Sequence, residues 1–76
     1  MKIKEMEIGS KGKIKGYTPT GRAYRQKLLA MGLIRGAEFT LVRKAPLGDP
    51  VEIKLASFNL TLRGEEADAL EVEQVS

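Results

Sequence analysis

The chain has 76 residues, enough for one domain, and domains of this size bury only about 60% of their extended-chain surface. Its hydrophobic fraction of 42% and charged fraction of 30% are typical of a globular protein, not of a disordered or fibrous one. The absence of Cys and His excludes disulfides, thiolate nucleophiles, imidazole bases and tetrahedral zinc sites. No apolar run reaches the about 18 residues of a membrane span or forms a signal-peptide core, so a cytoplasmic location is expected.

The net charge of +3 hides a strong asymmetry along the chain. Residues 1–44 contain 11 basic and 3 acidic side chains, whereas residues 45–76 contain 2 basic and 7 acidic ones. This split indicates a dipolar surface suited to an acidic partner, a membrane surface or nucleic acid. The alternative is that the two halves interleave in the fold and the charges cancel.

The first segments in chain order read as strands. Near-alternating apolar residues over 2–8 predict an irregular lead or edge strand. Residues 11–17 predict a second strand with Ile14 and Tyr17 to bury, and its outward lysines are a device that discourages aggregation at sheet edges. The sequence Thr-Pro-Thr-Gly at 18–21 ends this strand.

A helix is predicted over about residues 21–31, because Tyr24, Leu28 and Met31 recur at helical spacing. Thr20 is the favoured N-cap and Thr18 the alternative. A helix of this length is marginal alone in water, so its apolar stripe is expected to close an open end of a small barrel.

The helix is expected to end at Gly32, with Leu33 folding back onto Leu28 as in a Schellman motif. Gly36 then turns the chain into the next strand.

The remainder predicts four more strands, over 37–45, 51–55, 58–63 and 70–75. Residues 56–57 form a tight hairpin, 46–50 a Pro/Gly loop, and 65–69 one helical turn with acids near its N-terminus. The fold class is therefore mainly β: a small SH3-like barrel of about five antiparallel strands with one inserted helix, and an OB-like barrel as the nearest competitor. We find no linker or repeat, so one domain is expected over 1–76.

Several segments in this order resemble the FeoA family, the small cytoplasmic accessory proteins of bacterial ferrous iron transport. The segments that carry the resemblance are Gly9 and Gly12 with Ile14, the run 28–36 (LLAMGLIRG), the run 43–50 (RKAPLGDP), and 60–63 (LTLR) followed by Glu66 and Ala67. The resemblance implies an SH3-like barrel with an added helix. It also implies a role beside FeoB, a membrane permease with a GTP-binding domain, at the inner face of the membrane. One departure is Ser57, where the family tends to have a glycine, which affects the turn geometry there.

Motifs for other chemistries are weaker. The loop around Gly12 and Lys13 lacks the spacing and the Ser or Thr of a Walker motif. Glu65, Glu66 and Asp68 could be read as a cation site, but three acids on one exposed helical turn are expected to be solvated, so no metal or cofactor is predicted.

Nucleic-acid binding is a third possibility raised by the basic first half, and it is weakened by the few aromatic side chains. Tyr17, Tyr24, Phe39 and Phe58 are the aromatic residues of the chain, and both phenylalanines fall in core patterns. No nucleic-acid partner is therefore expected.

Surface recognition remains, and we predict a non-enzymatic protein that docks on the FeoB GTP-binding region and tunes ferrous iron uptake. The predicted contact residues lie around the helix and the following turn and on the Pro/Gly loop: Tyr24, Arg25, Leu33, Ile34, Arg35, Pro46, Leu47 and Asp49. Arg22, Arg25 and Arg35 are candidates for an arginine supplied in trans to a GTPase. The alternatives are a free-standing regulatory domain like the SH3-like module of iron-dependent repressors, and a small basic nucleic-acid-binding barrel. Whether the chain also forms homo-oligomers is left open by the sequence.

Overall fold

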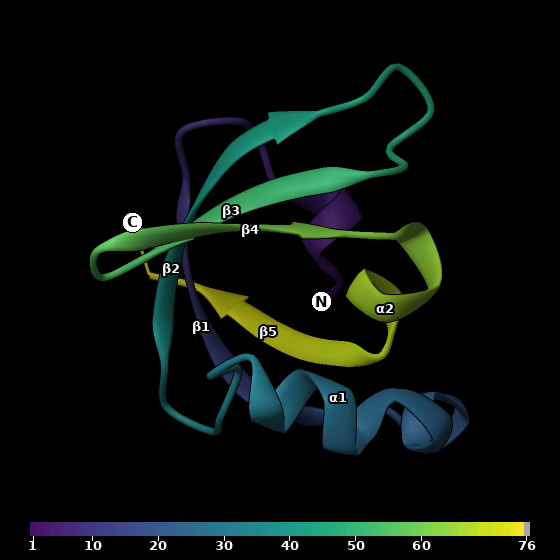
Figure 1. Cartoon of the computed structure of the whole chain (residues 1–76). Helices are drawn as coiled ribbons and strands as arrows, with labels where there is room; N and C mark the ends of the chain where they lie inside the picture. Colours follow the sequence, from purple (N-terminus) through teal and green to yellow (C-terminus); the bar gives the residue numbers. More distant parts are fainter. Residues whose placement is uncertain (76) are drawn as a thin grey trace.

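A computed structural model describes residues 1–75, except for the side chain of Thr20. Five strands form one sheet: β1 (Lys11–Tyr17), β2 (Glu38–Lys44), β3 (Val51–Leu55), β4 (Phe58–Leu62) and β5 (Leu70–Gln74). The helical segments are η1 (Ile3–Glu5), η2 (Pro19–Tyr24), α1 (Arg25–Ala30) and α2 (Gly64–Asp68). Figure 1 shows the sheet curling around the interior, with α1 lying along its lower opening in that view.

The strands are ordered β4-β3-β2-β1-β5, and every neighbouring pair is antiparallel. The predicted architecture of five antiparallel strands with one inserted helix is confirmed. The strand bounds agree with the sequence pattern to within a residue, and the predicted helical turn at 65–69 is α2.

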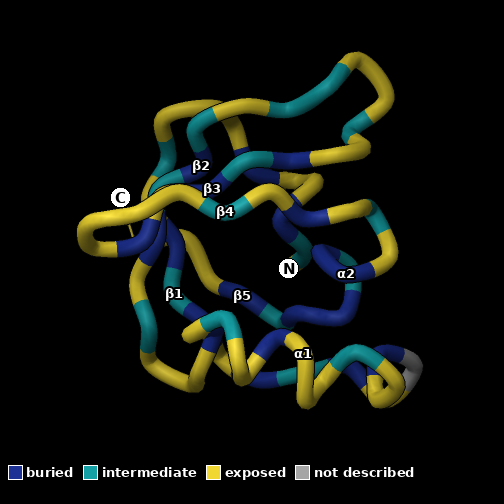
Figure 2. The backbone as a smooth tube through the Cα atoms, in the orientation of Figure 1, coloured by how far each residue is buried: buried dark blue, intermediate teal, exposed yellow. Residues whose placement is uncertain are grey.

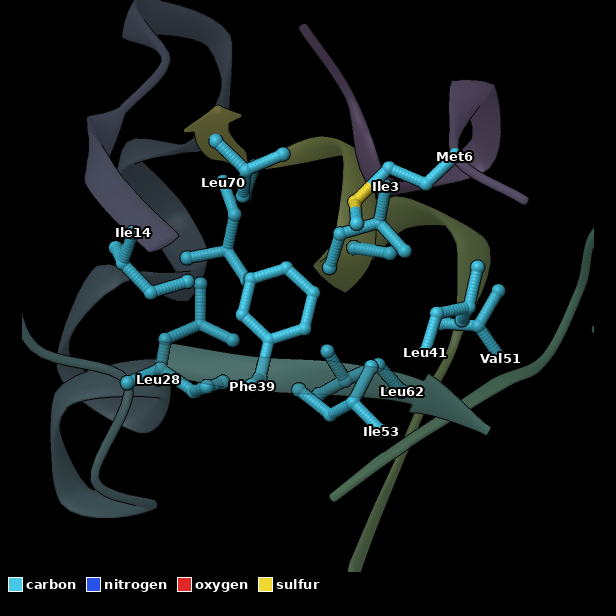
Figure 3. Packing of buried hydrophobic residues seen from close by; sticks show 14 of the residues in the cluster. Ile3, Met6, Ile14, Leu28, Phe39, Leu41, Val51, Ile53, Leu62 and Leu70 are labelled. Carbon is cyan, nitrogen blue, oxygen red and sulfur yellow. The ribbon is translucent and has the colours of Figure 1, made fainter. Parts of the chain in front are cut away.

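The core centres on Phe39, whose ring lies among the side chains of Ile14, Leu28 and Leu70 (Figure 3). Gly12 of β1 passes directly over this ring, because a Cβ atom at that position would lie 2.5 Å from Phe39 Cζ. Figure 2 shows buried residues alternating with more exposed ones along β1 and β3, whereas the turn between β3 and β4 is exposed.

The predicted lead strand over 2–8 is wrong. Residues 3–5 form the 3₁₀ turn η1, and the buried side chains are Ile3 and Met6, whose spacing of three suits such a turn. Ile8, which completes the near-alternating pattern, is 59% exposed. Lys44 Nζ fixes the segment by donating to the carbonyl of Met6 at 2.8 Å.

β1 is not at the edge of the sheet, although its outward lysines suggested a device of edge strands. It lies between β2 and β5. Its outer face meets solvent in the barrel, and this alone accounts for the alternating lysines.

The helical segment begins after Thr18, with Pro19 in its first turn, so the alternative N-cap is correct. The assignment of Thr20 as the N-cap is wrong, because Thr20 lies inside the 3₁₀ segment; its side chain is outside the described part of the chain. Tyr24 and Met31 are half-buried against the core and Leu28 is fully buried, which confirms the predicted stripe.

The helix ends in the predicted Schellman motif. The N–H of Leu33 donates to the carbonyl of Leu28 and the N–H of Gly32 to that of Leu29, both at 3.0 Å. Gly32 has φ +91°, a left-handed conformation that glycine adopts without steric cost.

The hairpin between β3 and β4 turns at an unexpected residue. The backbone angle φ is positive at Ala56 (+34°) and not at Ser57, the residue that stands where the family tends to have a glycine. This is the first loop position, at which a type II′ hairpin turn has glycine.

Candidate partner-binding surface

Two arginines flank Tyr17 at the end of β1. Arg25 Cζ lies 5.3 Å from the centre of the Tyr17 ring, and the Tyr17 hydroxyl donates to the carbonyl of Leu33 at 2.5 Å. Arg35 lies over the neighbouring Gly16, its guanidinium 3.4 Å from where a Cβ atom would stand. Neither arginine forms an ion pair with any of the described acidic side chains. The end of β1 therefore presents two unneutralised cations.

The turn after the helix supplies an apolar neighbour to these cations. Ile34 is 52% exposed and stands directly before Arg35. Leu33 does not share this surface: its side chain is completely buried in the core, so its assignment as a contact residue is corrected. The buried Leu33 holds the turn in place and leaves Ile34 and Arg35 to face solvent.

The loop between β2 and β3 carries the second predicted patch. Leu47 is 95% exposed and Pro46 is also exposed. Asp49 has an internal role, because its Oδ1 accepts the N–H of Gly64 at 2.8 Å at the start of α2. The tip of this loop at Leu47 is therefore exposed to solvent, and Asp49 at its base is hydrogen-bonded to the start of α2.

Tyr24 and Asp49, far apart in sequence, line one cleft of about 380 Å³. The other lining residues, which sequence analysis did not assign to a site, are Lys27, Arg63, Glu65 and Glu66. The structure thus separates the predicted residues into three places: the Arg25–Ile34–Arg35 surface, the cleft, and the loop tip at Leu47.

Most charges in the cleft already have partners. Glu66 is only 5% exposed and accepts hydrogen bonds from Lys27 Nζ and, at 3.0 Å, from the N–H of Arg63. Both bonds hold the pKa of the Glu66 carboxyl below its usual range, and the bond from Lys27 has the larger effect. The hydroxyl of Tyr24 donates to Glu65, and this bond raises the pKa of Tyr24. The expectation that Glu66 belongs to a solvated acidic turn is therefore wrong.

The signal that could have located Glu66 is its position three residues after the N-cap Arg63, where a Glu side chain can bond back to the N-cap N–H. Within residues 1–75, no group of three Asp or Glu side chains is placed to hold a metal ion.

The two oppositely charged halves of the sequence do interleave. Lys4 pairs with Asp68 at 3.5 Å and Lys15 with Glu73 at 3.9 Å, and Lys27 joins Glu66. The charge asymmetry is thereby partly neutralised inside the molecule.

Phe58 departs from its predicted place in the core, since it is 47% exposed. It begins β4 beside the hairpin, and its ring tip lies 3.9 Å from where a Cβ atom at Gly32 would stand.

The five strands and the helix inserted after β1 form a small SH3-like barrel, and its surface carries unpaired cations and isolated exposed apolar side chains. The match to known sequences gives the family within this class. The sequence pattern of the FeoA domain matches residues 1–74, and the chain belongs to the FeoA family of ferrous iron transport.

Two relatives illustrate the membership. The chain is 36% identical over 76 residues to an Fe(2+) transport protein A/Fe(2+) transporter FeoB fusion protein of Porphyromonas gingivalis, covering all of this chain and 9% of that protein. The chain thus spans only a small part of this relative's length. The solution structure of a FeoA-like protein from Clostridium acetobutylicum superposes with a TM-score of 0.86 at 38% identity, covering 100% of this chain and 87% of that one.

The same fold occurs in a different class of protein. A manganese-dependent transcriptional repressor has a TM-score of 0.87 over 99% of this chain and 36% of its own, at 9% identity, which is a likeness of fold alone.

In residues 1–75 there is no helix with the length and apolar character needed to cross a bilayer.

Proposed function

We propose that this chain is a non-enzymatic accessory protein of ferrous iron uptake that docks on the cytoplasmic GTP-binding region of a FeoB-like permease. The observation that supports it is the Porphyromonas gingivalis relative, in which a FeoA part and a FeoB part are named in one fusion protein. Joining two domains in one chain gives each a high effective concentration near the other. An association between a FeoA domain and a FeoB domain then depends on the surface that the FeoA domain presents.

The surface we assign to this contact is formed by Arg25, Ile34 and Arg35. Both guanidiniums lack a carboxylate partner among the described residues, and Ile34, directly before Arg35, offers an exposed apolar group. Arginine is well suited to planar, bidentate binding of carboxylates. An acidic face on the permease therefore fits this surface, and the Pro46–Leu47 loop tip provides a second, apolar contact.

The test is a calorimetric titration of the chain against the soluble GTP-binding domain of the permease, with and without guanine nucleotide. The double variant Arg25→Glu/Arg35→Glu should weaken binding by at least about tenfold, since like charges now face the partner. Lys11→Glu is a control for a charge reversal elsewhere on β1, because Lys11 is exposed at the other end of the strand and forms no ion pair with a described carboxylate. No binding at high micromolar concentration would refute the proposal.

A second candidate is a regulatory domain acting on a transcription factor, and the shared fold of the manganese-dependent repressor favours it. A change in the GTP turnover of the purified permease domain when this chain is added would support the first function. Pull-down of a metal-dependent repressor, with no association to the permease domain, would support the second.

A further inference from the structure

Tyr17 is the last residue of β1, and its side chain contacts two separate parts of the Arg25–Ile34–Arg35 surface. The Arg25 guanidinium lies over its ring, with 5.3 Å between Cζ and the ring centre. Its hydroxyl donates to the carbonyl of Leu33, two residues before Arg35, at 2.5 Å. One half-buried side chain of the sheet therefore joins a cation of α1 to the turn that follows α1.

The turn between α1 and β2 is bonded to β1 at both of its ends. At the far end, the N–H of Gly36 donates to the carbonyl of Ile14 at 2.8 Å, and the N–H of Ile14 donates to the carbonyl of Ala37 at 2.9 Å. Ile34 and Arg35 lie between this attachment and the Tyr17 hydroxyl, and both side chains are exposed. The hydroxyl therefore links β1 to the α1 end of the turn.

The Tyr17 ring is the group that orients Arg25. Arg25 is exposed and forms no ion pair with a described carboxylate, so no acid directs its guanidinium. An arginine over an aromatic ring is attracted by the negative face of that ring. This contact keeps the cation beside the turn without neutralising it.

The second cation lies next to the same residue. The Arg35 guanidinium is 3.4 Å from the Cβ position of Gly16, which directly precedes Tyr17. The acidic residue opposite Gly16 in the strand register is Glu71, and its carboxylate forms ion pairs with the Met1 amino group at 2.6 Å and with Lys2 at 3.5 Å. Arg35 is thus placed by the end of β1 and keeps its charge available.

We propose that Tyr17 is a positioning residue of the permease contact: its ring sets the direction of Arg25, and its hydroxyl sets the place of the turn that carries Ile34 and Arg35. The permease domain then meets the three side chains in one arrangement. Contact groups held by supporting bonds select one geometry, whereas loosely held charges attract many acidic surfaces. This inference rests on the proposed function and deepens it, because it assigns the specificity of the contact to a residue beneath the surface.

Two variants remove the contacts of Tyr17 and change no charge. Tyr17→Phe keeps the ring and removes the hydroxyl, and Tyr17→Leu removes both. In a titration against the soluble GTP-binding domain of the permease, Tyr17→Phe should weaken binding about threefold or more and Tyr17→Leu about tenfold or more. Thr61→Val removes an exposed hydroxyl from β4 and is the control, which should bind like the unaltered chain.

Double-mutant cycles show through which side chain each contact acts. In an Arg25→Ala background, Tyr17→Leu should bind no more weakly than Tyr17→Phe, because the ring acts through Arg25. In an Arg35→Ala background, the loss caused by Tyr17→Phe should shrink to less than about twofold, because the hydroxyl acts through the turn. Equal losses in every background would assign Tyr17 a merely structural role and overturn the inference.

The free chain gives a readout that does not depend on the partner. NMR should show ring-current shifts on the Arg25 side-chain protons in the unaltered chain and in Tyr17→Phe, and should show their loss in Tyr17→Leu. The Leu33 carbonyl carbon should shift in both variants, since it loses its hydrogen-bond donor.

The inference and the proposed function fail in different ways. Unchanged Arg25 shifts in Tyr17→Leu, or binding of both variants as tight as that of the unaltered chain, would overturn the inference and leave the proposed function in place. No binding of the unaltered chain would refute the proposed function, and the inference with it.

Discussion

Lys27 on α1 and the buried Glu66 on α2 form an ion pair that joins the inserted helix to the turn before β5, across 39 residues of sequence. The carboxylate is nearly inaccessible to solvent, and its remaining bond is to the N–H of Arg63. A buried carboxylate that loses its cation keeps the desolvation cost without the attraction.

Lys27→Met should therefore lower the free energy of unfolding by about 1–2 kcal/mol, measured by urea denaturation. Arg22→Met is the matched control, because Arg22 is an exposed cation on the neighbouring η2 with no ion pair to a described acid. Its effect should stay within about 0.5 kcal/mol. Equal losses in the two variants would show that the ion pair contributes nothing.

The same pair predicts a direction of pH dependence. Because the folded protein holds the pKa of Glu66 below its ordinary value of 4.5, the unfolded chain takes up the proton first as pH falls. The contribution of Glu66 is complete above that ordinary value and is lost as pH falls through the lowered folded pKa. Denaturation between about pH 7 and about pH 3 should show this loss, and Glu66→Gln should flatten it.

Ala56→Gly should stabilise the protein by about 1 kcal/mol, since Ala56 has φ +34°, a region that strains residues with a Cβ atom. Thermal or urea denaturation measures the gain. Ser57→Gly is the control in the same loop and should give no gain, because Ser57 is not among the residues with positive φ. Stabilisation by Ser57→Gly without stabilisation by Ala56→Gly would contradict this turn geometry.

Gly21→Ala should destabilise the fold by about 1–3 kcal/mol, because the new Cβ would stand 2.3 Å from Ala69 Cβ and 2.6 Å from its Cα. Gly16→Ala adds the same methyl group where its nearest neighbour is the end of the flexible Arg35 side chain, at 3.4 Å. Urea denaturation should separate the two variants clearly. Similar losses would mean that η2 can shift away from Ala69.

Features set by neighbouring residues were predictable from the sequence. The Schellman ending depends only on residues 28–33, and the strand at 51–55 shows its buried face by simple alternation. The same local reading failed at residues 3–5, where Ile3 and Met6 fit two patterns and the packing of η1 decided between them.

The candidate site was less predictable, because it depends on residues that only the fold brings together. The place of β1 inside the sheet, the exposure of Phe58 and the burial of Glu66 all follow from strand order and from the helix position. Ile34 and Leu33 are adjacent and both apolar, and only the packing of the turn shows that one is core and the other surface.

The turn between α1 and β2 has a thermodynamic consequence for any partner that contacts it. Gly32 and Gly36 fix its two ends with positive φ, Leu33 is locked in the core, and the Tyr17 hydroxyl holds the Leu33 carbonyl. A partner that binds Ile34 and Arg35 therefore orders two side chains on a backbone that is already set. Little conformational entropy is lost on association, so even a small contact here can give useful affinity.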